Sequence, residues 1–358
     1  MTVCILGNGL TALTLAKTLV NKNIYVDLLV PKKEHKLSHT RTLGISKTNS
    51  DFFNRDIISI EKLLWKLKRI EIFSENLKKE KLINFENKED QLFSMIKNYQ
   101  LYEILKKSLK KNKFLNYKKN YNFKHILKHS NNLVINCDPY NEISKKFFSN
   151  KIKKNYSSIA YTTIINHKKI SKNNTAIQIF TNKGPIAFLP ISNNKTSIVY
   201  SYRESNNKKE VDINSLIKKF NPKYKILSIE NLSKFKLTSS NLRKYYQGNI
   251  MAFGDLLHKI HPLAGQGFNM SIRDISKLIK LIENRINLGL DLDHSICFEF
   301  QKETKDKNYI FTTGVDLIYE FFNFESKFKS NFLNKTINLV GKNRSLNTLF
   351  KKIADVGI

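Results

Sequence analysis

Glycine is scarce in this sequence, and its distribution constrains the fold. Only 12 of the 358 residues are glycine, and five of them lie in two short segments, at Gly7, Gly9, Gly254, Gly265 and Gly267. Each segment follows a short apolar run and precedes an apolar stripe at helical spacing. A strand, a tight turn and a helix in this order build parallel sheets. The sequence therefore predicts an α/β fold to which two distant strand-to-helix turns contribute.

The first glycine segment lies between a predicted strand over residues 2–6 and a predicted helix over 10–20, and a second buried strand is predicted over 24–30. Its order, Gly-Asn-Gly-Leu-Thr-Ala, is a GxGxxA form of the dinucleotide-binding fingerprint. Gly7 permits the tight turn, Gly9 lets the backbone approach a pyrophosphate, and Ala12 keeps the helix close to the strand. The N-terminus of the helix offers N–H groups to phosphates. A tight turn without a ligand is the alternative.

The second glycine segment runs from Gly254 to Asn269 and again connects a strand to a helix. A carboxylate such as Asp255, at the end of a strand, can accept hydrogen bonds from ribose or ribityl hydroxyls. Gly265 and Gly267 allow backbone N–H groups to lie against a flat ring. His258 and His261 stand three residues apart, but no third ligand is nearby and a proline follows, so no metal site is predicted.

The remaining segments suggest three parts. We predict mostly helices over the Lys-rich residues 58–130, a strand over 132–137, an antiparallel sheet over 156–203 and a strand over 249–254 that returns to the first sheet. A helix is expected from about Gly267. The C-terminal segment is predicted to be helical, with Phe311, Val315, Ile318 and Phe322 on one face. The predicted division is a discontinuous domain of residues 1–150 and 245–295, a sheet domain of 151–244, and C-terminal helices over 296–358.

Charge and cysteine content limit the classes of partner. The sequence has 62 Lys+Arg against 30 Asp+Glu, a formal charge of +32, which attracts anionic partners. The lysines are spread along the chain, as A/T-rich coding would also produce, and no RNA-recognition or zinc-finger signature is present, so no nucleic-acid partner is expected. Cys4, Cys137 and Cys297 form no CxxC pair, which indicates a reducing compartment. No signal peptide and no apolar stretch of ~20 residues is found. We expect a cytoplasmic protein.

The pattern GD(x)2H(x)2HP(x)2GQG(x)N of residues 254–269 resembles the second FAD motif of the group A flavin monooxygenases, typified by para-hydroxybenzoate hydroxylase. The resemblance is strongest to their ubiquinone-biosynthesis branch. Residues 40–46 (TRTLGIS) are similar to the family's Arg-containing stretch. Residues 176–190 (AIQIFTNKGPIAFLP) are similar to the substrate-domain sheet of that branch, and residues 300–302 resemble the start of the helix after the motif.

The resemblance implies a Rossmann-like FAD-binding domain, an inserted antiparallel-sheet substrate domain and a helical C-terminus. The implied activity is hydroxylation of an aromatic ring, of a polyprenyl phenol intermediate in ubiquinone biosynthesis, with NAD(P)H as transient co-substrate and O2 activated as a flavin C4a-hydroperoxide. It also implies a lipophilic phenolic substrate and a ubiquinone-biosynthesis complex as partners. The residues implied to bind FAD are Gly7, Gly9, Ala12, Arg41, Gly254, Asp255, Gly265, Gln266, Gly267 and Asn269. Those implied to lie at the reacting ring are Pro262, Gly265 and Gln266.

The sequence also departs from the family pattern. Val30 stands where an acidic residue is expected to bind the adenosine ribose, with Asp27 earlier in the strand. The family's Asp-Gly after the middle strand is Asp138-Pro139. These departures favour an alternative function, a catalytically degenerate flavoprotein that acts as a scaffold in a ubiquinone-biosynthesis complex.

A membrane-bound substrate would also place the protein at the inner face of the cytoplasmic membrane. The C-terminal helix combines phenylalanines with lysines that would contact anionic lipid, at Lys305, Lys307, Lys327 and Lys329. Packing of these phenylalanines on the core is the other interpretation.

Overall fold

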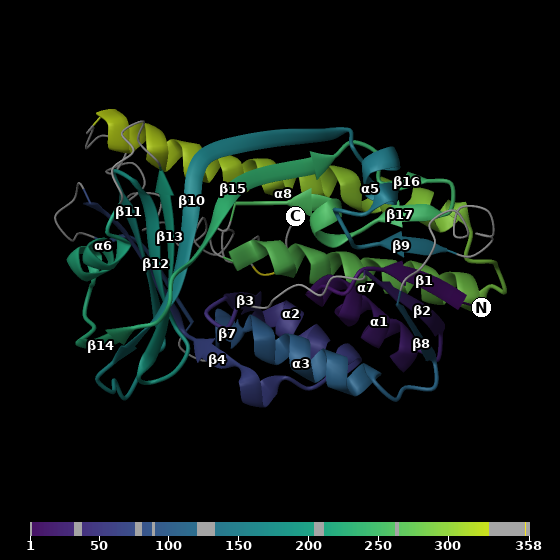
Figure 1. The fold of residues 1–358 in the computed structure, drawn as a ribbon, viewed down its shortest axis with the longest axis horizontal. Coiled ribbons are helices and arrows are strands. Elements are labelled where there is room, and N and C mark those ends of the chain that lie inside the picture. The colour runs from purple at the N-terminus through teal and green to yellow at the C-terminus, as the bar shows by residue number, and fades with distance from the viewer. Residues whose placement is uncertain are drawn as a thin grey trace.

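The computed structural model describes residues 2–31, 38–75, 81–87, 90–119, 133–203, 211–261 and 265–328 and Asp355, with side chains up to residue 320 and at Asp355. Figure 1 shows two groups of strands, joined by long strands and flanked by a long C-terminal helix. None of the described helices combines the length and apolar character needed to cross a membrane.

A six-stranded sheet forms the first group, in the order β16-β17-β9-β1-β2-β8. The five strands from β17 to β8 pair in parallel, and β16 is antiparallel to β17. The strands are β1 (Thr2–Leu6), β2 (Tyr25–Val30), β8 (Leu115–Lys119), β9 (Val134–Asn136), β16 (Tyr246–Gln247) and β17 (Ile250–Ala252). The predicted strands at 2–6, 24–30, 132–137 and 249–254 are confirmed, including the return of β17 to this sheet.

Helices bury apolar stripes against this sheet in one shared core. They include α1 (Leu10–Asn21), α3 (Asn98–Leu109), α5 (Glu142–Phe147) and α7 (Gln266–Asn287). In α7 the residues at helical spacing, Ile272, Ile275, Ile279 and Ile282, are buried as predicted. The core therefore joins residues from both ends of the sequence.

The second group is a nine-stranded sheet, in the order β18-β15-β10-β13-β12-β11-β5-β6, with β14 paired to β10. Its strands are β5 (Arg69–Ser74), β6 (Lys81–Glu86), β10 (Lys151–His167), β11 (Thr175–Thr181), β12 (Gly184–Pro190), β13 (Lys195–Arg203), β14 (Ile226–Ile229), β15 (Ser233–Leu242) and β18 (His258–Lys259). The antiparallel sheet predicted over 156–203 is confirmed. Helix α6 (Ile213–Phe220) covers it with Ile213 and Ile217.

The helical prediction for residues 58–130 is wrong. In the described part, α3 is the one α-helix of this range, and β5 and β6 join the large sheet. Alternating Ile70 and Ile72 fit a strand, and β5 pairs in parallel with β11, from Arg69 with Thr175 onwards. This partner lies far along the chain. Pairing with it, and not the local lysine content, therefore determines that these residues form a strand. The division into domains stays a prediction, and β5 and β6 lie in the large sheet although their residues fall within 1–150.

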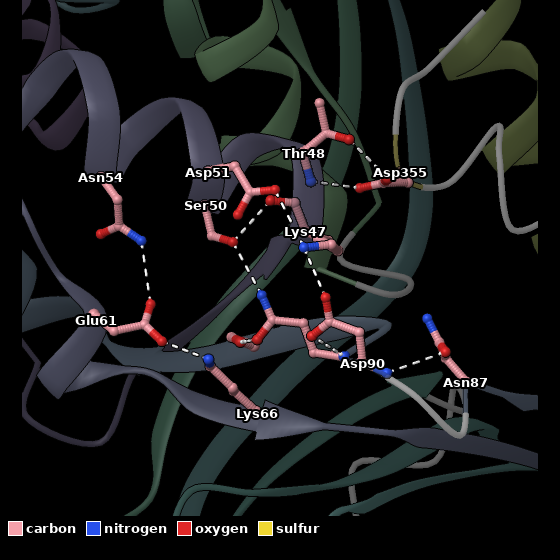
Figure 2. A network of polar contacts seen from close by, with 12 residues as sticks. Lys47, Thr48, Ser50, Asp51, Asn54, Glu61, Lys66, Asn87, Asp90 and Asp355 are labelled. Carbon is pink, nitrogen blue, oxygen red and sulfur yellow. Dashed lines mark hydrogen bonds and ion pairs between the residues drawn. The ribbon is translucent and has the colours of Figure 1, made fainter.

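A small three-stranded sheet, β3-β7-β4, lies beside α7. It consists of β3 (Thr42–Ser46), β4 (Trp65–Leu67) and β7 (Phe93–Lys97), and β3 continues into the short helix α2 (Lys47–Phe52). Figure 2 shows the polar network around α2. Lys47 Nζ lies 2.7 Å from Asp90 Oδ2, and the Thr48 N–H donates to Asp355 Oδ1 at 2.9 Å. A residue from the far end of the sequence thus caps α2.

The C-terminal helix α8 (His294–Phe328) confirms the predicted helical C-terminus. Of the residues that the sequence placed on one face, Phe311 and Val315 are buried, whereas Ile318 is 43% exposed. The side chain of Phe322 lies outside the described residues. Tyr319, one residue further than Ile318, is the buried side chain instead. At this end α8 packs against β10 and the second glycine segment, which shifts the contact face.

A substitution of Phe300 in α8 tests the packing of the shared core. The Phe300 side chain is 0% exposed and contacts Phe253, with ring centroids 5.6 Å apart. We expect Phe300→Ala to lower the free energy of unfolding by about 3–5 kcal/mol through lost burial and a cavity. Phe298→Ala, on the same helix but 52% exposed, is the matched control and should change it by less than about 0.5 kcal/mol. Equal urea midpoints for both variants would contradict this packing.

Candidate functional site

The carboxyl ends of β1, β9 and β17 meet at one edge of the six-stranded sheet. β1 lies between β2 and β9, so the chain leaves β1 toward one side and later returns on the other. In open α/β sheets, ligands bind at such a switch point, outside the carboxyl ends of the strands. Both glycine segments and the loop after β9 start from this edge, which makes it the candidate site.

Gly7 forms the tight turn after β1. Its φ is +120°, a region that side chains disfavour, and a Cβ there would lie 3.4 Å from the backbone nitrogen of Asp138. Its N–H donates to the carbonyl of Leu29 at 2.9 Å. The turn after β1 is therefore in contact with the loop after β9.

Gly9 caps α1 without a side chain, and α1 has no acidic residue in its first turn. A Cβ at Gly9 would have no atom within 4 Å. The first N–H groups of a helix have no partners inside the helix, and they attract anions. Ala12, one turn on, is fully buried. This arrangement leaves open space for a phosphate directly beside Gly9.

Gly254 brings the second glycine segment against the first. Its φ is +63°, and a Cβ there would lie 2.9 Å from Thr11 Cγ2 in the first turn of α1. A side chain at residue 254 would therefore push the two turns apart. The two segments form one site, although most of the sequence lies between them.

Asp255 follows in a short 3-10 turn and is exposed. Among the described residues, its carboxylate has neither a hydrogen bond nor an ion pair. Burial raises the pKa of the Cys137 thiol, and the carboxylates of Asp138 and Asp255 raise it further, so both lie near the end of β9. Asp255 is therefore available to a ligand hydroxyl at the switch point.

The start of α7 forms the other end of the site. Gly265 adopts a left-handed conformation with φ +65°, and a Cβ there would lie 3.3 Å from the backbone nitrogen of Gly44 in β3. Gln266 is 9% exposed, and its Oε1 is buried with no hydrogen-bond partner in the described structure. Such an orphaned acceptor indicates a missing donor. Gly267 follows in the first turn of α7. Pro262 lies outside the described residues.

Asn269 uses its amide within the protein. Its Nδ2 donates to the carbonyl of Gly44 at 2.9 Å, and its Oδ1 accepts from the Ser46 N–H, also at 2.9 Å. Asn49 donates to the same oxygen at 2.9 Å. The side chain therefore holds β3 and α2 against α7 and has little capacity left for a ligand.

Arg41 precedes β3 and is exposed. Its guanidinium carbon lies 5.8 Å from the centroid of the Phe235 ring in β15 of the large sheet. This contact places Arg41 between the small and the large sheet. It is not among the residues gathered around Gly7 and Gly254.

The departures from the family pattern concern the end of β2. Val30 is buried there. Asp27 cannot take the place of the acidic residue that the family pattern has at the position of Val30. Its carboxylate already accepts from Asn116 Nδ2 at 2.9 Å and lies 3.2 Å from Lys118 Nζ of β8. After β9, the Asp138 carboxylate accepts from the Tyr140 N–H at 2.9 Å and so closes the turn around Pro139. The departures from the family pattern thus lie near β2 and after β9.

A buried pair in the second segment was missed by the sequence analysis. His258 Nε2 lies 2.6 Å from Asp274 Oδ2 of α7, and Asn308 of α8 donates to the other carboxylate oxygen at 3.1 Å. The acidic residue on an otherwise apolar helix face was the available signal. The structure describes no cluster of three or more metal-binding side chains in the ranges given above.

Comparisons with known proteins agree with this site. Residues 132–287 match the family model of the FAD binding domain. The chain is 32% identical to 3-demethoxyubiquinol 3-hydroxylase of Escherichia coli over 149 residues, or 40% of this chain and 38% of that protein. It is 25% identical to the mitochondrial ubiquinone biosynthesis monooxygenase COQ6 of Danio rerio over 232 residues, 52% of this chain and 47% of the relative. The match thus spans less than half the length of these relatives.

Solved structures share the fold over nearly the whole chain. The p-nitrophenol 4-monooxygenase PnpA of Pseudomonas putida superposes with a TM-score of 0.79 at 12% identity, covering 99% of this chain and 98% of that one. Klebsiella pneumoniae HpxO, crystallised with FAD and uric acid, gives 0.75 at 10% identity, over 99% and 96%. The α/β fold with its helical C-terminus and the resemblance to FAD-dependent aromatic monooxygenases are confirmed. Residues 132–287 of this chain are similar to the FAD binding domain family.

Proposed function

We propose that this protein is an FAD-dependent monooxygenase that hydroxylates an aromatic ring, with a polyprenyl phenol of ubiquinone biosynthesis as substrate. The contact of Gly254 with Thr11 carries the proposal, because it joins the two glycine segments into one site. The similarity to two ubiquinone-biosynthesis hydroxylases supports the substrate class. The co-substrates in this proposal are NAD(P)H and O2.

Different residues would contact different parts of the cofactor. Gly9 and the N-terminus of α1 would hold the pyrophosphate, and Asp255 would accept hydrogen bonds from sugar hydroxyls. The N-terminus of α7 and Gln266 would face the flat ring. Asn269 acts as a positioning residue that holds β3 beside α7.

Bound FAD supplies the redox chemistry, so no nucleophilic side chain is required. The remaining tasks of the protein are to orient the phenol, exclude water and stabilise charge on the ring. Pro262 and Arg41 are proposed to contact the ring region. The large sheet is proposed as the substrate domain, and the division of the chain at residues 150, 244 and 295 belongs to the same proposal.

Because Val30 stands in place of an acidic residue, binding of the adenosine end of FAD lacks one hydrogen bond, to the ribose. A charge-assisted hydrogen bond contributes about 1.5–3 kcal/mol. Its loss lowers FAD affinity about tenfold to a hundredfold, since each ~1.4 kcal/mol is a factor of ten. A flavin held by the rest of the site survives such a loss. The altered β2 end and Pro139 favour the second candidate function, a scaffold in a biosynthetic complex that binds flavin without hydroxylation.

Asp255→Ala tests the cofactor assignment. We expect FAD affinity to fall about tenfold to a hundredfold, because the sugar hydroxyls lose a charged acceptor. Titration of the apoprotein with FAD, followed by flavin fluorescence, measures the effect. Asp291→Ala removes another exposed carboxylate, from the connection between α7 and α8, and should bind FAD like the wild type. Unchanged affinity in Asp255→Ala would remove this residue from the site.

Turnover separates the two candidate functions. With excess FAD, NAD(P)H and a prenylated phenol, a hydroxylase yields a product heavier by one oxygen atom and oxidises NAD(P)H faster when the phenol is present. Mass spectrometry of the phenol and absorbance of the nicotinamide measure both results. A protein that binds FAD but does neither with any candidate phenol is a scaffold.

Peripheral membrane contact is proposed through one stripe of α8. Phe298, Lys302, Lys305 and Tyr309 recur at spacings of four, three and four residues, which places them on one helix face. Phe298, Lys302 and Tyr309 are exposed. Lys307 is exposed nearby, and the side chains of Lys327 and Lys329 lie outside the described residues. Apolar insertion and attraction to anionic lipid act together on such a face.

Liposome flotation tests this stripe. We expect Phe298→Ser/Tyr309→Ser to lower binding to anionic vesicles at low salt at least about tenfold, because two large side chains no longer insert. Leu227→Ser/Leu232→Ser removes exposed leucines at and near β14 and serves as control. A wild type that fails to float with anionic vesicles, or a control that loses as much binding, would sink the proposal.

A further inference from the structure

His261 of the second glycine segment is enclosed by aromatic side chains. Its ring lies 4.3 Å from the Tyr319 ring of α8 and 4.8 Å from the Tyr156 ring of β10, centroid to centroid. The two tyrosine rings are 5.0 Å apart and meet edge to face. Such pairs stabilise a defined geometry beyond their buried area. His261 is thus held from two elements that are distant from it in sequence.

Polar groups fix the two tyrosines in turn. The Tyr156 hydroxyl donates to Asp316 Oδ1 of α8 in a short hydrogen bond, and Ser239 of β15 donates to the other carboxylate oxygen at 3.3 Å. The Tyr319 hydroxyl lies 3.1 Å from Ser158 Oγ of β10. Strand and helix are therefore joined by side-chain bonds of both tyrosines that contact the His261 ring.

Ile260, the preceding residue, is also held by α8. It packs in a buried cluster with Phe311 and Val315 of α8 and Met270 of α7. Burial and, to a lesser extent, the Lys154 charge lower the pKa of His261 to about 3, so the ring is neutral at physiological pH. A neutral, buried and stacked ring is a structural anchor and not a proton donor at the site.

We infer that Tyr156, Asp316 and Tyr319 are positioning residues that set the placement of the second glycine segment through His261. These three side chains form the seat of His261, and His261 precedes Gly265 and Gln266 by only a few residues. The seat therefore controls where the N-terminus of α7 meets the cofactor ring. This inference rests on the proposed function, because it gives that seat a role in orienting the flavin ring.

The seat should affect orientation more than affinity. The contacts of Gly9, Asp255 and the α1 N-terminus to the cofactor lie elsewhere and would hold most of the binding energy. Placement of a reacting ring is more demanding, because an error of about 1 Å can lower a rate about a hundredfold. Loosening the seat should therefore separate the turnover rate from FAD affinity.

Tyr156→Phe and Asp316→Asn are the test variants: the first removes the hydroxyl that donates to Asp316, the second removes the charge of the acceptor, and both keep the side-chain shape. We expect FAD affinity within about threefold of wild type, a changed visible circular dichroism and reduction potential of the bound flavin, and a kcat about tenfold to a hundredfold lower. The double variant should show the same changes as Tyr156→Phe alone, because the charge of Asp316 acts on Tyr156 through the hydroxyl that Tyr156→Phe already removes.

Tyr200→Phe is the matched control. Tyr200 is fully buried in the large sheet, and its hydroxyl lies 3.2 Å from Thr181 Oγ1. The control should leave the flavin dichroism and potential unchanged. A wild type that binds no FAD would overturn both the proposed function and this inference. A wild type that binds FAD, with a flavin signal that Tyr156→Phe and Asp316→Asn leave unchanged or that Tyr200→Phe alters equally, would overturn only the inference.

Discussion

The close approach of two backbone turns, at Gly254 and at the first turn of α1, is the contact on which the rest of the structure depends. A Cβ at Gly254 would lie 2.9 Å from Thr11 Cγ2, so there is no room for a side chain at residue 254. The contact requires β17 to lie beside β9 and β9 beside β1, so that segments from both ends of the chain share one sheet. It also directs α7 toward β3, where Gly265 meets Gly44 and Asn269 fastens the strand.

The electrostatics of the site differ along its length. Near α1 the attraction for an anion comes from the backbone N–H groups at the N-terminus of the helix. Near β2 the chain has Val30, and the carboxylate of Asp27 already binds β8. Near α7 a buried amide oxygen of Gln266 has no described partner. The altered part of the proposed site is therefore the end near β2, whereas Gln266 near α7 keeps an acceptor without a partner in the described residues.

Local patterns predicted the parts of the fold that local physics determines. Short apolar runs, apolar stripes at helical spacing and the two glycine turns indicated β1, α1, β2, β9 and α7, because a strand-to-helix turn is encoded within a few residues. Gly7, Gly254 and Asp255 could be predicted for the same reason. β5 and β6 could not, because β5 joins the large sheet through β11, which lies far along the chain, and β6 joins it only through β5. The internal use of Asn269, the pairing of His258 with Asp274 and the seat around His261 depend on α7 and α8 packing, which no short window contains.

Strand β10 runs without interruption from the side of the six-stranded sheet into the large sheet, as Figure 1 shows. Its register against β15 shifts between Asn155 and Ile159, and Ser157 adopts a left-handed φ of 49° in that interval. Tyr156 and Ser158, the β10 side chains of the His261 seat, flank this residue. One bent peptide segment thus sets both the direction of the large sheet and the seat of the second glycine segment. The large sheet is consequently not an exchangeable module: under the proposed function, an altered bend that suits a different substrate would also displace the second glycine segment, so substrate choice and cofactor placement must change together.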